Sequence, residues 1–181
     1  THYTFWPGMG HLPSDVAPDL RSRSYRISVD LEVLSDRDSG VLIAHGDATG
    51  GYSLYMDNGH LVHDLNIGGT HQLLTSPEPV VPGRRELAFV MQRQPQDDNS
   101  VIGRASLRVD DVEVAELSTN SIFTLMISWS GLDIGFDRGT TVGNYASPFT
   151  FSGKLHKVTV DLSDDQELDH DGVGRAEMAR E

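Results

Sequence analysis

Alternation of apolar and polar side chains marks the first long strand of this chain. From Tyr25 to Val33 every second residue is apolar and the residues between them are polar or charged, which is typical of a strand with one buried face. The segment from Gly40 to Gly46 is apolar at both parities, which favours a central strand covered on both faces. Asn58-Gly59 then separates two further apolar runs and supplies the positive φ angles of a tight hairpin turn.

Short apolar runs separated by turn signals continue along the rest of the chain, and no convincing helix interrupts them. About ten or eleven such strands predict an all-β sandwich, jelly roll or barrel. The later strands are expected at His71–Thr75, Arg85–Gln92, Ala105–Val109, Val112–Ala115, Leu125–Ser128, Leu132–Phe136 and Leu155–Leu162.

A single domain accounts for the length of the chain. We predict a β-sandwich over residues 1–162. Its N-terminal arm is expected to be held on the sandwich by Trp6, which would act as a buried plug. Residues 163–181 are predicted to form an acidic linker and a C-terminal tail. The tail has a helical pattern from Gly174 onward but is too short to be stable in water alone, so it would have to dock on something.

The net negative charge of the chain makes anionic partners unfavourable. The chain has 14 basic and 27 acidic residues and a net charge of −13. Such a field repels nucleic acid and anionic lipid surfaces, so neither is an expected partner. It also repels sulfated polysaccharide unless Lys and Arg cluster locally. The chain contains no cysteine, which excludes disulfides, thiolate nucleophiles and Cys-ligated zinc.

Residues with catalytic chemistry are few. Asp111 and Glu113 lie on one strand face, a spacing that a retaining glycosidase uses. However, Val112 and Val114 take the inward parity, which favours two solvated acids, and Glu116 falls on the other parity. No Gly-rich phosphate loop and no nucleophile elbow occurs.

His45, His60 and His63 could each bind a metal ion or act in catalysis, or could have a purely structural role. His60 and His63 are three residues apart on a predicted strand, so they face opposite ways and cannot share a metal ion without a bulge. His63 is expected to be packed and hydrogen-bonded, and His45 to cap its strand rather than act as an acid or base.

Two aspartates and three aromatic residues are the candidate site residues. Asp133 and Asp137 are four apart and could face a calcium ion, although both could instead accept hydrogen bonds from turn amides. Tyr52, Tyr55 and Trp129 are candidates for a ligand-binding or interface face.

An ordered set of short motifs resembles the C-terminal accessory domain of large bacterial arylsulfatases, and it covers nearly the whole chain. The motifs are Phe5-Trp6-Pro7-Gly8, Gly40–Gly46, Gly50–Tyr55, Asn58–Val62, Leu132–Asp137, Pro148–Gly153 and Lys157–Leu162. The sequence departs from that family at His63, Leu65, Thr141 and the loop Gln94–Asn99, which puts a shared substrate preference in doubt.

The resemblance implies a concanavalin-A-like jelly roll appended to a sulfatase catalytic domain, with calcium possible in that parent protein. The chain has no Cys/Ser-x-Pro-x-Arg motif, so no sulfatase activity is assigned to it and no cofactor is expected in it. The implied partners are the catalytic domain and an oligomer neighbour. The alternative is an independent lectin-like carbohydrate-binding module.

Overall fold

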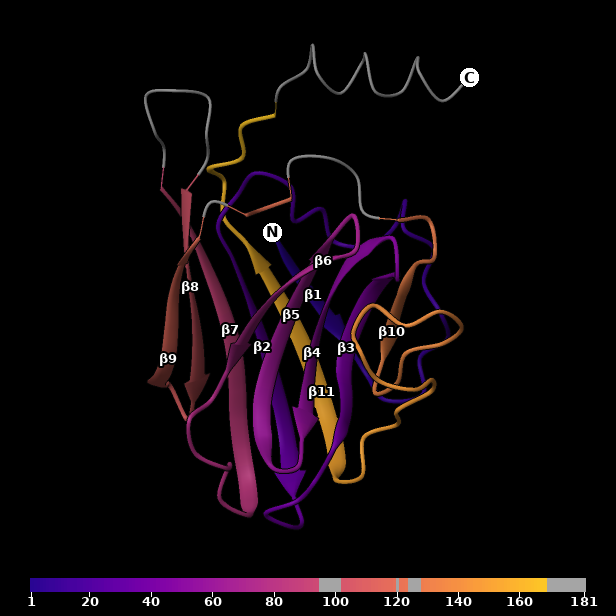
Figure 1. The fold of residues 1–181 in the computed structure, drawn as a ribbon, viewed down its shortest axis with the longest axis vertical. Helices are drawn as coiled ribbons and strands as arrows, with labels where there is room; N and C mark the ends of the chain where they lie inside the picture. Colours follow the sequence, from indigo (N-terminus) through magenta and orange to yellow (C-terminus); the bar gives the residue numbers. More distant parts are fainter. Residues whose placement is uncertain (95–101, 120, 124–127, 169–181) are drawn as a thin grey trace.

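The protein consists of two antiparallel sheets packed face to face (Figure 1). The structure is a computed structural model and describes residues 1–94, 102–119, 121–123 and 128–168. The six-stranded sheet contains, in spatial order, β1 (His2–Phe5), β11 (Lys154–Leu162), β2 (Tyr25–Val33), β7 (Gly83–Gln94), β8 (Ile102–Val109) and β9 (Val112–Thr119). The five-stranded sheet contains β10 (Leu132–Ile134), β3 (Gly40–Asp47), β4 (Gly50–Asp57), β5 (His60–Ile67) and β6 (Thr70–Thr75). No helix occurs within the described residues. The predicted all-β sandwich is confirmed.

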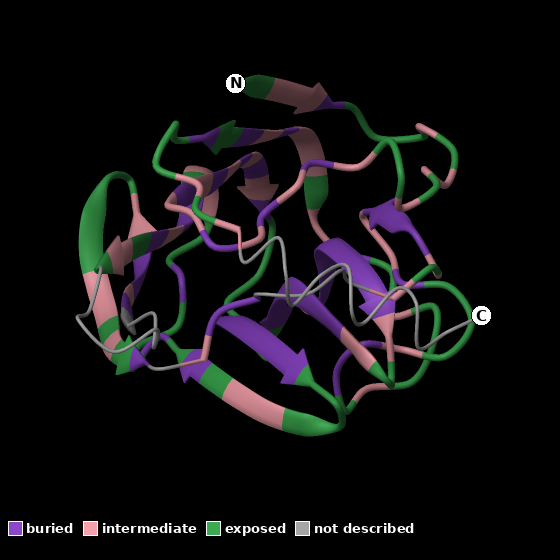
Figure 2. Ribbon diagram, turned by 90° about the horizontal axis from the view of Figure 1, so that it is seen from above, coloured by how far each residue is buried: buried purple, intermediate pink, exposed green. Residues whose placement is uncertain are grey.

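The main hydrophobic core lies between the two sheets. Along β2 every second residue from Tyr25 to Val33 is buried, as its alternation predicts. Side chains of β4 from the facing sheet, such as Leu54 and Met56, belong to the same buried cluster. Exposed residues gather mainly in the connecting segments around the rim (Figure 2).

A second, smaller apolar cluster covers the outer face of the five-stranded sheet. Residues 135–150, here called the covering loop, follow β10 and lie beside β3 (Figure 1). The Val41 amide donates to the carbonyl of Phe149 at 2.8 Å. The cluster joins the sheet to the loop through Val41, Ala44, Tyr55, Val62 and Val142. Strand β3 is therefore buried on both faces, as its apolar sequence predicts.

Two local predictions are wrong. The strand expected at Leu132–Phe136 ends at Ile134, and the next residue, Gly135, has a φ of +80°, a left-handed conformation that glycine adopts readily in turns. Trp6 is not a plug, since 55% of it is exposed. The N-terminal arm is held by β1 instead, which pairs with β11 and buries Phe5.

The segment after β11 is only partly described. The Asp165 carboxylate accepts hydrogen bonds from the Ser24 amide and hydroxyl at 2.9 and 2.6 Å, so this part of the predicted linker lies on the sandwich. The division at residue 162 stays a prediction. The expected helical tail, most of the polar loop that begins at Gln94 and most of the strand expected at Leu125–Ser128 lie outside the described residues.

The glycine in the β4–β5 turn gives a direct test of the fold. Asp57 pairs with His60, leaving the two-residue turn Asn58-Gly59, in which both residues have positive φ, 48° and 86°. A Cβ on Gly59 would lie 2.0 Å from the carbonyl oxygen of Asp36. We expect Gly59→Ala to lower the free energy of unfolding by about 3 kcal/mol, because backbone strain adds to a clash with backbone.

A matched control separates strain from clash. Gly68 also has a positive φ, 61°, in the β5–β6 turn, but a Cβ there would meet nothing within 4 Å. Gly68→Ala is expected to cost about 1 kcal/mol, for strain alone. Chemical denaturation of both variants gives the comparison. Equal losses would mean that the contact between Gly59 and Asp36 does not constrain the turn.

Candidate functional site

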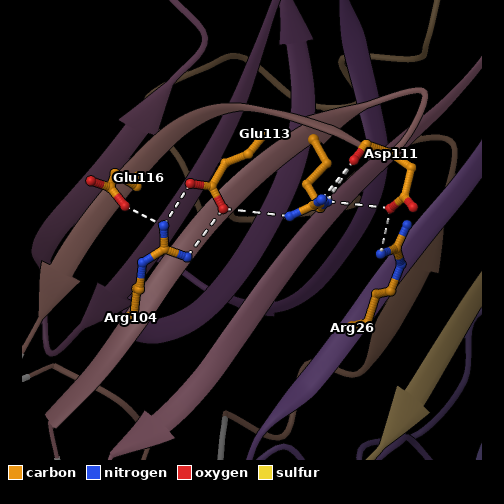
Figure 3. A network of polar contacts seen from close by, with 6 residues as sticks. Arg26, Arg104, Asp111, Glu113 and Glu116 are labelled. Atoms are coloured by element: carbon orange, nitrogen blue, oxygen red, sulfur yellow. Dashed lines mark hydrogen bonds and ion pairs between the residues drawn. The ribbon is translucent and has the colours of Figure 1, made fainter.

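Asp111 and Glu113, whose spacing resembles that of glycosidase carboxylates, belong to a network of ion pairs on the six-stranded sheet (Figure 3). Arg104 donates to Glu113 at 3.1 Å and also bonds Glu116, while Arg26 donates to Asp111 at 3.2 Å. These bonds lower the pKa of Glu113 and of Asp111. A general acid needs a raised pKa inside a cleft, so this arrangement does not form a glycosidase centre.

A β-bulge corrects the predicted parity of Glu116. Pairing between β8 and β9 shifts between Leu107 and Arg108, which leaves Val114 unmatched. The extra residue turns the rest of β9 by one side-chain position. Glu116 therefore lies on the same face as Glu113, and both reach Arg104.

Asp133 and Asp137 are both buried and bonded to turn amides. The Arg138 amide donates to Asp133 at 3.1 Å, and the Val142 amide donates to Asp137 at 3.0 Å. His11 also bonds Asp133 through Nδ1 at 3.0 Å. Within the described part of the chain, no group of three His, Cys, Asp or Glu residues is placed to hold a metal ion. The contacts match the turn interpretation, and calcium binding stays a prediction.

His45, His60 and His63 each contact other parts of the fold. His63 is buried and stacks on Phe89 with ring centroids 3.5 Å apart, although its Nε2 has no hydrogen-bond partner. His45 is buried, and its Nε2 lies 3.1 Å from the Ser14 hydroxyl. His60 bonds the carbonyl of Ser76 through Nδ1 at 2.8 Å.

The three candidate aromatic residues do not share a face. Tyr52 has no exposed surface and belongs to the core between the sheets, so the prediction that it contacts a ligand is wrong. Tyr55 lies on the opposite face of β4, where Tyr145 and Phe149 cover it. Trp129 is 68% exposed and stays a proposed contact residue.

A pocket of about 610 Å³ opens where the covering loop meets β6. This volume is in the range of small-molecule sites. Side chains with hydrogen-bonding groups make up much of its lining: His71, Thr140, Thr141, Asn144, Tyr145 and Ser147. We call it the loop pocket.

Buried carboxylates hold two of the lining side chains. Asp64 is fully buried on β5, and both of its oxygens lie 2.9 Å from Nδ1 of His71. Burial raises the pKa of the Asp64 carboxyl, while the bond from His71 opposes that rise. The Tyr145 hydroxyl donates to Asp137 at 2.7 Å. Both lining residues are thus fixed in orientation from behind.

Asn66 fastens the covering loop to the sheet. Its amide nitrogen donates to the carbonyl of Val142 and to that of Ala48, both at 3.1 Å, and its oxygen accepts from the Gly69 amide at 2.8 Å. All these bonds are local to the loop pocket. The wall of the pocket is therefore held by hydrogen bonds within the protein.

Sequence reasoning did not find the loop pocket. Asp64 and Asn66 have the parity of solvent-facing residues on β5, and His71 is an isolated histidine on an edge strand. The only available signal was the density of polar residues at the outward positions of β5. Nothing local indicates that a loop some seventy residues later covers them.

Two other cavities are smaller. A groove of about 380 Å³ runs between residues 76–81 and the β8–β9 hairpin, where Val80, Val109 and Val114 line it. A charged cavity of about 310 Å³ lies on the six-stranded sheet between Arg84, Asp30 and Lys157.

The architecture places the chain among jelly-roll β-sandwiches. No protein-family model and no curated protein matches it. Solved structures share the fold. The CBM40 domain of Ruminococcus gnavus IT-sialidase, bound to alpha2,3 sialyllactose, is similar with a TM-score of 0.54 and 18% identity over 80% of this chain and 80% of that one.

Two larger proteins contain the same fold. Domains LG4-5 of the mouse laminin alpha1 chain give a TM-score of 0.56 and 13% identity over 94% of this chain and 40% of that chain. The leech intramolecular trans-sialidase gives 0.52 and 16% identity over 86% of this chain and 23% of that chain. These likenesses show the jelly-roll fold, and none of them links the chain to arylsulfatases.

Proposed function

We propose that this domain is a non-catalytic, lectin-like carbohydrate-binding module that takes part of a glycan in the loop pocket. The observation that carries the proposal is a pre-formed cavity lined by hydroxyl, amide and imidazole groups, two of them fixed by buried carboxylates. Sugars bind through such fixed hydrogen-bonding groups. The CBM40 structure that shares the fold is bound to sialyllactose, which supports carbohydrate as the ligand class.

Binding of glycans by the 181-residue chain is the direct test. We expect hits on a glycan array and a loss of about ten-fold in affinity on Asn144→Ala, because Asn144 is exposed and lines the loop pocket and one lost hydrogen bond is worth about 1.4 kcal/mol. Arg84→Ala on the six-stranded sheet is the control. The absence of any hit would refute the function. A loss of affinity with Arg84→Ala but not with Asn144→Ala would place the binding site on the six-stranded sheet instead.

A second candidate function is the accessory domain of an arylsulfatase that packs on its catalytic domain or on an oligomer neighbour. The exposed valines Val81 and Val112, 64% and 65% accessible, and the apolar groove next to Val80 support it, because exposed apolar patches commonly mark interfaces. The gene upstream of Thr1 distinguishes the two candidates. A Cys-x-Pro-x-Arg motif a few hundred residues earlier would favour the sulfatase, and a free-standing module would contradict it.

A further inference from the structure

The loop pocket carries no fixed positive charge. None of the described residues that line it is Lys or Arg. Arg138 comes directly before the lining segment, but its Nε lies 3.4 Å from Asp133 and its guanidinium lies over the Phe136 ring. The net charge of the chain, −13, adds a repulsive background for an anion.

Negative charge lies directly behind the pocket wall. Asp64 and Asp137 are each bonded to a lining side chain, His71 and Tyr145, at 2.9 and 2.7 Å. An anionic ligand that contacts either side chain is therefore only one side chain away from a buried carboxylate. Such charges are poorly screened by salt, because protein rather than water surrounds them.

The hydrogen-bonding direction of these two side chains also discriminates between ligands. Nδ1 of His71 lies 2.9 Å from both oxygens of Asp64, and a carboxylate accepts hydrogen bonds, so this contact selects the tautomer with the proton on Nδ1. In that tautomer Nε2 is an acceptor. The Tyr145 hydroxyl proton is directed at Asp137, which leaves the phenol oxygen as an acceptor. Both groups are matched by ligands that donate. Sugar hydroxyls donate, whereas carboxylates and sulfates offer acceptors only.

We propose that the loop pocket takes an uncharged, hydroxyl-rich sugar and excludes sugars that carry a carboxylate or a sulfate. This inference rests on the proposed glycan-binding function and specifies its substrate class. It separates the chain from the sialyllactose-bound CBM40 domain that shares its fold. The local charge and the donor–acceptor pattern at Asp64, His71, Tyr145 and Asp137 carry it.

Matched glycan pairs test the inference. Each pair contains a neutral oligosaccharide and the same oligosaccharide with one sialic acid or one sulfate at a terminal position, printed on one array. We expect the wild-type chain to bind the neutral member at least ten-fold more tightly. Calorimetry on the best pair measures the ratio in solution.

A charge-gain variant locates the discrimination. Thr140 is exposed and lines the loop pocket, so Thr140→Lys introduces the missing cation there. It is expected to improve binding of the anionic member relative to the neutral one by at least five-fold. Thr159→Lys adds the same charge on the six-stranded sheet, beside the charged cavity, and should leave the ratio as in the wild type. Thermal melting checks that both variants are folded.

The possible outcomes distinguish a failure of the uncharged-sugar inference from a failure of the proposed glycan-binding function. Anionic members that bind the wild-type chain equally well or better, with binding lost on Asn144→Ala, would overturn the uncharged class and leave the glycan-binding function intact. An equal effect of Thr140→Lys and Thr159→Lys would attribute the selectivity to net charge and also overturn the inference. No binding of any member would remove both.

Discussion

Acidification from pH 7 to pH 4 is expected to remove several kcal/mol of the free energy of unfolding, mainly through two buried histidines. Burial lowers the pKa of His63 to about 3, and burial together with nearby His11 lowers the pKa of His45 to about 4. In the unfolded chain both titrate near their ordinary value of 6.5. The unfolded state thus binds more protons below pH 6.5, and stability falls with pH from there down to the folded pKa values.

The contribution of His63 can be isolated by substitution. At roughly 1.4 kcal/mol per pH unit, it amounts to about 3 kcal/mol between pH 6.5 and pH 4. His63 is flanked across the sheet by Leu54 and Leu74, so a leucine fits the apolar surroundings. We expect His63→Leu to keep or raise stability at pH 7, because the buried Nε2 has no partner, and to flatten the acid side of the curve.

Urea denaturation at half-unit pH intervals measures this effect. Gly68→Ala serves as the control, since it changes no titratable group and a Cβ there meets nothing within 4 Å, and its curve should run parallel to that of the wild type. A His63→Leu variant with the full wild-type acid dependence would show that His63 is not buried as a neutral ring in solution.

Removal of the Asp137 side chain is expected to release the covering loop. Asp137→Ala leaves the buried Val142 amide and the Tyr145 hydroxyl without their acceptor, at a cost of about 3 kcal/mol. The outer apolar cluster, which includes Tyr55 and Val142, would then lose its cover. The proposed glycan binding in the loop pocket should fall at least ten-fold, because Tyr145 lines that pocket.

Asp137→Asn is the matched variant. It keeps one oxygen acceptor and removes the charge, whose burial raises the pKa of Asp137. The expected loss is about 1 kcal/mol, measured by denaturation, and the Val142 amide should exchange with solvent more slowly than in Asp137→Ala. Equal stability of the two variants would show that the hydrogen bonds to Asp137 do not hold the loop.

The sequence by itself determined most of the strands and the inward faces of the central ones. Alternation from Tyr25 to Val33 and the apolar run from Gly40 to Gly46 predict the burial observed along β2 and β3. Asn58-Gly59 predicts the hairpin and both of its positive φ angles. These properties are local, because side-chain parity and backbone φ depend on a few neighbouring residues.

Local patterns did not predict the face of a side chain where a single extra residue shifts the alternation along a strand. They also did not predict where a strand ends early. The bulge at Val114 moves Glu116 to the face of Glu113, and β10 ends two residues early, before Gly135. Tyr52 and Tyr55 were grouped as candidates for one face, but they are three residues apart on β4 and therefore lie on opposite faces. The local pattern did not indicate that the Tyr52 face meets the other sheet and that the Tyr55 face meets a loop.

Only the tertiary structure decided where the loop pocket lies. Asp64 and His71 come from adjacent strands, while Asp137 and Tyr145 come from a loop some seventy residues later. In the sequence these are ordinary polar residues at outward positions. They form a site because β10 pairs with β3 at one edge of the sheet and carries the covering loop across its outer face. Burial by a distant segment, which no local pattern encodes, fixes the orientation of these groups and raises the pKa of Asp64 and Asp137.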